Sequence, residues 1–198
     1  MSDRSVRESW KKLYTIANRQ GGYITAKQAA SVGYDRQHLN YHRRSGNIEH
    51  VAWGLYRVNQ VPIDEEDDFI RVLLSLRNRK DQPQGVLSHR TAMSLHGLSD
   101  LFADQIHVTL LSGFRGKVPE GCIVHRDQWT PSDTEPWKVG FVTTPLRTLL
   151  DAGEDPAVST EQLEVAVRDA LDQGLVGKRR LAKTARGRLR EVLEAGVL

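Results

Sequence analysis

The sequence has a single cysteine and no long apolar segment. Cys122 stands alone, which excludes an intrachain disulfide and any Cys-x-x-Cys metal site. No apolar run approaches the roughly 20 residues that a membrane helix needs. The polar start, Met1-Ser2-Asp3-Arg4, lacks the apolar core of a signal peptide. We therefore expect a protein of the reducing cytoplasm with no membrane attachment.

The motifs of common catalytic sites are also missing. No G-x-G-x-x-G, G-x-S-x-G or H-E-x-x-H pattern occurs, nor the Asp/Glu-x-Lys that ends a common nuclease motif. The segment 113–117 is too short for a phosphate loop, and no Ser or Thr follows Lys117. The histidines of the central region lack metal-site spacing: His89, His96, His107 and His125. We expect no enzymatic activity, no cofactor and no bound metal. The pairs His89-Arg90 and His125-Arg126 are open to a structural role or to contact with an acidic partner.

Charge is distributed unevenly along the chain. Residues 1–60 hold ten basic and four acidic side chains, a net charge of +6, whereas residues 61–174 carry −8 and residues 175–198 carry +5. A basic end binds polyanions and an acidic centre repels them. The alternative is random scatter over a solvated surface.

The N-terminal sixty residues predict three helices. Apolar residues at helical spacing predict a first helix over 6–18, ended by Gly21-Gly22. Thr25 suits the N-cap of a short helix over 26–31, and Asp35 suits the N-cap of a third helix that runs to about residue 45. Two short helices joined by a tight turn at Gly33 predict a helix-turn-helix.

The third helix has one apolar residue and a polar outer face. Leu39 is expected to point inward, and the opposite face then carries Gln37, Asn40, Tyr41 and Arg44. Such side chains read base edges or hold phosphates. An ordinary solvent-exposed face is the alternative, but such faces usually include glutamate, and none occurs from Arg36 to Gly46.

A β-hairpin is expected directly after this helix. Residues 48–51 and 55–58 alternate in polarity around Ala52-Trp53-Gly54, which predicts a wing. Arg57 and His50 are placed to touch backbone phosphate. Trp53, at or near the tip, is equally able to pack on its own hairpin.

The remaining sequence predicts a second, α+β domain, so we expect domains at 1–60 and 61–198. Strands are expected over 85–87, 104–111, 122–125 and 139–142, with helices after the caps Ser88, Thr144 and Ser159 and a basic helical tail from Lys178. The acidic run 64–68 suggests a metal site or a helix N-terminus. The apolar spacing of Phe69, Val72, Leu73 and Leu76 favours the helix.

Two groups of residues resemble the AbiEi-type antitoxins. Gly22-Tyr23-Ile24-Thr25 with the helices that follow and Trp53-Gly54-Leu55-Tyr56 resembles that family's N-terminal winged helix. Three later stretches resemble its C-terminal antitoxin domain in order and spacing: 87–98, 106–109 and 142–151. The likeness spans about residues 5–185. It implies a winged helix-turn-helix followed by a mixed α/β antitoxin domain.

The resemblance also implies a function. Members typically repress their own operon by binding its promoter as double-stranded DNA. They also counteract a nucleotidyltransferase toxin of a type IV toxin–antitoxin system, without a stable complex. The resemblance carries DNA contact over to the third helix: Arg36, Gln37, Asn40, Tyr41, Arg43 and Arg44. Arg57 of the hairpin joins them as a candidate, and a homodimer on DNA is expected on a repeated or palindromic operator. The alternative is an interaction module that binds a toxin or another protein directly, without sequence-specific DNA binding.

Overall fold

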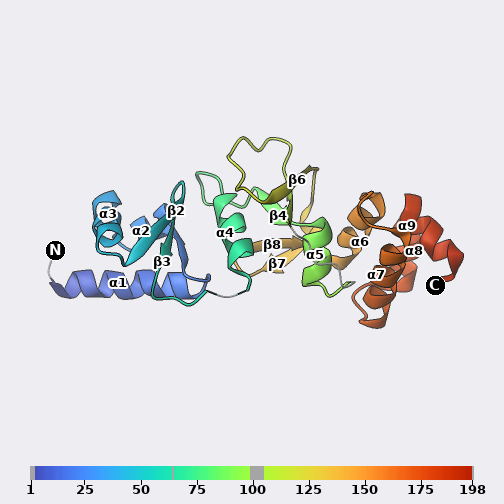
Figure 1. Ribbon diagram of the computed structural model, residues 1–198, viewed down its shortest axis with the longest axis horizontal. Helices are drawn as coiled ribbons and strands as arrows, with labels where there is room; N and C mark the ends of the chain where they lie inside the picture. Colours follow the sequence, from blue (N-terminus) through green and yellow to red (C-terminus); the bar gives the residue numbers. More distant parts are fainter. Residues whose placement is uncertain (1–2, 64, 99–104, 198) are drawn as a thin grey trace. The chain divides into compact units, whose positions relative to one another are not determined.

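The computed structural model describes residues 3–63, 65–98 and 105–197, and its fold is mixed α+β, as the sequence predicted (Figure 1). The chain forms two compact units, residues 1–83 with 138–140 and residues 84–137 with 141–198. The expected division after residue 60 stays a prediction. Asp64 and Asp104, each placed at the start of an expected element, lie outside the described residues. Over the described ranges, no helix is both long and apolar enough to span a bilayer.

The first unit contains the predicted helix-turn-helix and hairpin. Its elements are α1 (Asp3–Asn18), β1 (Tyr23–Thr25), α2 (Ala26–Ser31), α3 (Arg36–Arg44), β2 (Ile48–Ala52), β3 (Leu55–Val58) and α4 (Asp67–Ser75). The sheet has the order β1-β3-β2, and both pairs are antiparallel. The arrangement is consistent with a winged helix.

One hydrophobic core holds these helices against the small sheet. Leu13 and Ala17 of α1 pack with Leu39 of α3, Ile48 of β2 and Val58 of β3. All five side chains are at most 3% exposed. Burial of the apolar face of α3 fixes the rotation of that helix about its axis.

The second unit combines a five-stranded sheet with five α-helices among its described residues. The strands are β4 (Gly85–Leu87), β5 (Ile106–Leu110), β6 (Cys122–Arg126), β7 (Thr134–Trp137) and β8 (Gly140–Thr143). The helices are α5 (His89–Leu95), α6 (Pro145–Glu154), α7 (Thr160–Asp172), α8 (Lys178–Thr184) and α9 (Gly187–Val192). A short 3₁₀ turn spans Pro131–Asp133, and a π-helical segment, Leu193–Val197, follows α9.

The sheet has the order β6-β5-β4-β8-β7. β4 pairs antiparallel with β5 and parallel with β8, and β5 pairs parallel with β6. The described helices α5 to α9 share a second core that includes Met93, Leu149, Leu163 and Leu189. Figure 1 shows α6 to α9 gathered at the C-terminal end of the unit.

Two features of this unit differ from the sequence predictions. Strand β7 was not predicted, because Pro136 argues against a strand. The structure tolerates this proline because β7 lies at the edge of the sheet. The tail was expected to be helical from Lys178, and it forms two helices, α8 and α9, because the backbone of Ala185 and Arg186 is not helical. The strands expected in this unit appear over 85–87, 106–110, 122–126 and 140–143, with ends within two residues of those predicted.

Candidate nucleic-acid interface

Local hydrogen bonds begin both helices of the helix-turn-helix where the sequence placed them. The backbone N–H of Gln28 donates to Thr25 Oγ1 at 3.2 Å, and the backbone N–H of Thr25 donates to Gln28 Oε1 at 2.9 Å, which completes a capping box on α2. On α3, His38 N–H donates to Asp35 Oδ1 at 2.9 Å. This bond holds the pKa of Asp35 below its usual value. Gly33, with φ +90°, makes the turn between the two helices.

The inner side of α3 is fixed by apolar and aromatic contacts. Leu39 is 3% exposed. One helical turn later, the His42 ring stacks on Trp10 of α1 with 4.4 Å between the ring centroids. Tyr34, just before the helix, closes the same cluster. These contacts leave the other side of α3 facing solvent.

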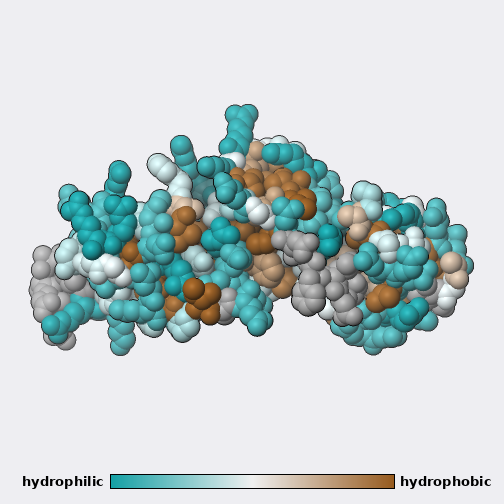
Figure 2. Space-filling view, viewed as in Figure 1, coloured by the Kyte–Doolittle hydropathy of each residue, from teal (hydrophilic) through white to brown (hydrophobic). Residues whose placement is uncertain are grey.

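The outer side of α3 gathers the predicted site residues. Arg36, Gln37, Tyr41, Arg43 and Arg44 are exposed, and Asn40 is half-buried. Within the described ranges, none of the three arginines makes an ion pair, and the helix contains no acidic residue. Figure 2 shows a mainly hydrophilic face over the region where Figure 1 places α3. Together these side chains form a cationic surface with hydrogen-bonding groups that extends along α3.

The wing is a short hairpin anchored to the helix-turn-helix. A two-residue turn, Trp53-Gly54, joins β2 to β3, and Gly54 supplies the positive φ of +70° that such a turn needs. Ala26 N–H donates to the Gly54 carbonyl at 2.7 Å, so the turn is tied to the start of α2. Trp53 is 98% exposed and therefore does not pack on its hairpin. His50 is exposed on β2, beside Tyr56.

Arg57 is not brought to this surface. Its side chain is 12% exposed, and Nη2 donates to the Val61 carbonyl at 2.7 Å. Its Nε lies 3.7 Å from Asp67 Oδ2, and the guanidinium lies 5.9 Å from the centre of the Tyr23 ring. The arginine thus joins β3 to the first turn of α4. No sequence signal pairs Arg57 with Asp67, because the two residues meet only through tertiary packing.

The acidic run before α4 has partners of a structural kind. Asp67 faces Arg57, and Asp68 accepts from Arg71 at 2.9 Å. Both acids lie in the first turn of α4, where a negative charge interacts favourably with the helix dipole. In the part of the chain that the structure describes, no group of three or more His, Cys, Asp or Glu side chains is placed to hold a metal ion.

Three histidines meet in the second unit, which sequence reasoning missed. His89 of α5 stacks on His125 of β6 with 3.4 Å between ring centroids, and His107 Nδ1 lies 3.0 Å from His125 Nε2. The register explains the meeting, since β5 and β6 pair in parallel and present alternate residues to one face. Burial and the neighbouring imidazoles lower the pKa of His89 to about 3 and that of His107 to about 4. Neutral imidazoles are therefore the forms present near pH 7.

A buried carboxylate borders this cluster. Asp151 Oδ1 accepts from Arg147 Nε at 2.7 Å, and its Oδ2 lies 3.9 Å from His89 Nδ1. Burial raises the pKa of Asp151 to about 6, against the opposing effect of Arg147. Ser88 ties the group to the sheet by accepting from Thr109 at 2.8 Å. The network joins α5, α6 and the strands β5 and β6.

Comparison with known families agrees with the resemblance seen in the sequence. The family model described as "Transcriptional regulator, AbiEi antitoxin" matches residues 11–59. Residues 11–59, called the AbiEi segment below, are therefore similar to the AbiEi antitoxin regulators. The AbiEi segment runs from α1 to the end of the wing and contains all seven candidate site residues.

Comparison with solved structures extends the fold similarity beyond the AbiEi segment. The crystal structure of the RV2827C protein from Mycobacterium tuberculosis is similar with a TM-score of 0.58 and 18% identity. The alignment covers 95% of this chain and 77% of that one. Identity at this level supports the fold alone. No curated protein matches the chain.

Proposed function

We propose that this chain is a cytoplasmic, DNA-binding transcriptional autorepressor that serves as the antitoxin of a type IV toxin–antitoxin system. The observation that carries the proposal is the outer face of α3. Arg36, Arg43 and Arg44 are exposed there within the AbiEi segment, on a helix with no acidic residue. A surface of like charges destabilises an isolated protein slightly, and a polyanion relieves that repulsion.

In this proposal, the outer face of α3 reads the DNA. α3 enters the major groove, where Gln37 and Asn40 can pair with adenine and an arginine with guanine. Tyr41 and the remaining arginines hold phosphates and set the register of the protein on the duplex. The wing then lies along adjacent backbone and carries His50 and Trp53. Arg57 acts through the wing by joining β3 to α4.

Replacement of two arginines tests this interface. We expect Arg43→Ala/Arg44→Ala to weaken binding to a duplex from upstream of the protein's own gene. If both arginines contact phosphates, their loss also makes the slope of log K against log salt concentration shallower by about 2. Gel shift or fluorescence anisotropy over a salt series measures both quantities.

A matched variant controls for net charge. Arg179→Ala/Arg180→Ala removes the same charge from two exposed arginines of α8, in the second unit. It should leave the affinity and its salt dependence closer to wild type than the α3 variant does. Equal losses in the two variants would indicate nonspecific attraction instead of a recognition helix.

The antitoxin part of the proposal needs a separate test. Cells arrested by a nucleotidyltransferase toxin encoded beside this gene should grow again when this chain is co-expressed. Size-exclusion chromatography of the two purified proteins should show no stable complex. Growth arrest that persists with the antitoxin present would reject this role, whatever the DNA result.

A direct protein-interaction module is the second candidate, and the exposure of Trp53 favours it. Tryptophan is enriched at the energetic centres of protein interfaces, and this one is 98% exposed. A partner that co-purifies equally with and without nuclease, and is lost in Trp53→Ala, would support this function.

Sedimentation with and without duplex would also test the expected homodimer on DNA.

A further inference from the structure

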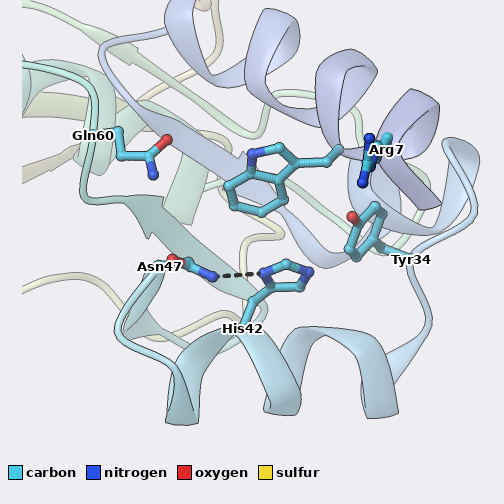
Figure 3. A pocket seen from close by; sticks show the side chains of 6 residues that line it. Arg7, Tyr34, His42, Asn47 and Gln60 are labelled. Carbon is cyan, nitrogen blue, oxygen red and sulfur yellow. Dashed lines mark hydrogen bonds between the residues drawn. The ribbon is translucent and has the colours of Figure 1, made fainter. Parts of the chain in front are cut away.

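A small pocket lies between α1 and α3, behind the proposed DNA-reading face. Its volume is about 270 Å³, and it is lined by Arg7, Trp10, Tyr34, His42, Asn47 and Gln60 (Figure 3). The stacked rings of Trp10 and His42 form one wall. The Tyr34 ring, tilted by 54° against His42 with 5.3 Å between the centroids, forms another. Three of the six residues that line the pocket are therefore aromatic.

One buried polar atom in this wall has no partner. Tyr34 is 2% exposed, and its hydroxyl makes no hydrogen bond to any described residue. Burial raises the pKa of the phenol, so the hydroxyl keeps its proton and can donate it in a hydrogen bond. A buried hydroxyl without a partner costs free energy that an acceptor from a ligand would recover.

Other polar groups in the pocket can also donate hydrogen bonds. Asn47 Nδ2 lies 3.1 Å from His42 Nδ1. When the amide donates to that nitrogen, the proton of the neutral ring sits on Nε2. Burial lowers the pKa of His42, which favours the neutral ring. Figure 3 shows Arg7 on the Tyr34 side of the pocket and Gln60 on the side of Asn47. A ligand suited to these groups presents acceptors.

We propose that this pocket binds a small planar aromatic carboxylate. The flat aromatic walls favour a flat apolar body, and the hydroxyl of Tyr34 with the positive charge of Arg7 favours an oxyanion. Size limits the ligand further. A cavity of about 150 Å³ accommodates benzene, so about 270 Å³ holds a single ring with its carboxylate.

The position of the pocket links the ligand to α3. His42 forms part of the wall, and its neighbours Tyr41 and Arg43 belong to the outer face of the same helix. A ligand seated against His42 favours one placement of α3 relative to α1 and so changes DNA affinity. This second step rests on the proposed function, whereas ligand binding itself does not.

Benzoate is the probe for the binding step, with the full chain and no DNA. We expect saturable binding of one benzoate per chain by calorimetry. Benzamide, which lacks the charge, and cyclohexanecarboxylate, which lacks the flat ring, should each bind at least several-fold more weakly. Absence of saturable benzoate binding, or equal binding of the three compounds, would overturn the proposal.

Tyr34→Phe isolates the contribution of the hydroxyl. The variant keeps the ring and removes a buried atom that has no partner, so it should fold normally and bind benzoate about tenfold more weakly, the usual effect of losing a hydrogen bond to a charged group. Tyr41→Phe makes the same change at a side chain that is 66% exposed and outside the pocket, and it should bind benzoate as wild type does. Equal affinity in Tyr34→Phe and wild type would contradict the assignment.

The coupling step is measured separately as promoter affinity with and without benzoate. A change in wild type that is absent in Tyr34→Phe supports coupling through α3, and an unchanged affinity in wild type rejects it. If the wild-type protein binds no duplex at all, the proposed function is rejected, whereas the benzoate-binding proposal is still decided by the measurement without DNA.

Discussion

Arginines of the first unit share a charge but occupy opposite environments. Arg43 and Arg44 are exposed on α3, whereas Arg57 is 12% exposed and lies between the Val61 carbonyl and Asp67. A surface arginine can exchange water for phosphate at small cost. A buried arginine holds its partners in place, and its removal leaves a buried carboxylate without that cation.

We expect Arg57→Ala to lower the free energy of unfolding by about 3 kcal/mol, the usual loss when one member of a buried ion pair is removed. Arg71→Ala is the matched control, because it breaks a pair with Asp68, whose side chain is 70% exposed, and it should cost under about 1 kcal/mol. Urea unfolding of both variants measures the difference. An Arg57→Ala protein of normal stability that binds DNA weakly would instead assign Arg57 to the DNA interface.

At the scale of elements, helix starts depend on side chains within one turn. Asp35 caps α3, and capping boxes begin α2 and α7. In α7, Gln162 N–H donates to Ser159 Oγ at 3.2 Å, and Ser159 N–H donates to Gln162 Oε1 at 2.8 Å. Leu163 then places the helix in the core of the second unit. These interactions are local, and each begins a helix at a definite residue.

Ser159→Ala should destabilise the second unit by about 1 kcal/mol, because an orphan N–H at the helix start loses its acceptor. Ser159→Asp keeps an acceptor and adds a favourable charge at the helix N-terminus, so it should match or exceed wild-type stability. Urea unfolding followed by circular dichroism measures both. Equal stability of the alanine and aspartate variants would show that the cap contributes nothing here.

At the scale of the whole molecule, the buried histidines link stability to pH. In the unfolded chain an imidazole takes up a proton near its ordinary pKa of 6.5, but in the fold the pKa is about 3 for His89 and about 4 for His107. Between these values the unfolded state binds more protons, so stability is lost as pH falls from about 6.5 towards 4. Asp151 acts in the opposite direction, because its folded pKa of about 6 exceeds 3.8 and the fold takes up a proton in this window. Two strongly shifted histidines outweigh one carboxyl.

We therefore expect the urea concentration at the unfolding midpoint of the second unit to decrease as the pH is lowered from 7 to 5. His89→Asn should flatten this dependence, because asparagine cannot titrate and tolerates the positive φ of +51° at this position. Tryptophan fluorescence and circular dichroism across the pH series provide the measurement. A midpoint that stays constant or rises on acidification would show that the network does not keep its imidazoles neutral.

Much of the first unit could be predicted from neighbouring residues alone. The spacing of Leu13 and Ala17, the caps Thr25 and Asp35, and the turn at Gly54 each act within a few residues, so the helices, the hairpin and the outward face of α3 follow directly. Strand β7 could not be predicted in this way, because its pairing with β8 in the sheet compensates for a poor local preference.

The uneven charge and the identity of the α3 side chains are properties of the sequence itself. The sequence also determined the helices and the hairpin of the first unit, because short-range hydrogen bonds and apolar periodicity fix these. Only the tertiary structure decided which side chains meet across long stretches of chain. It turned Arg57 inward to Asp67, left Trp53 in solvent and brought His89, His107 and His125 together. Such meetings depend on strand register and core packing, which combine residues far apart in the sequence and leave no local pattern.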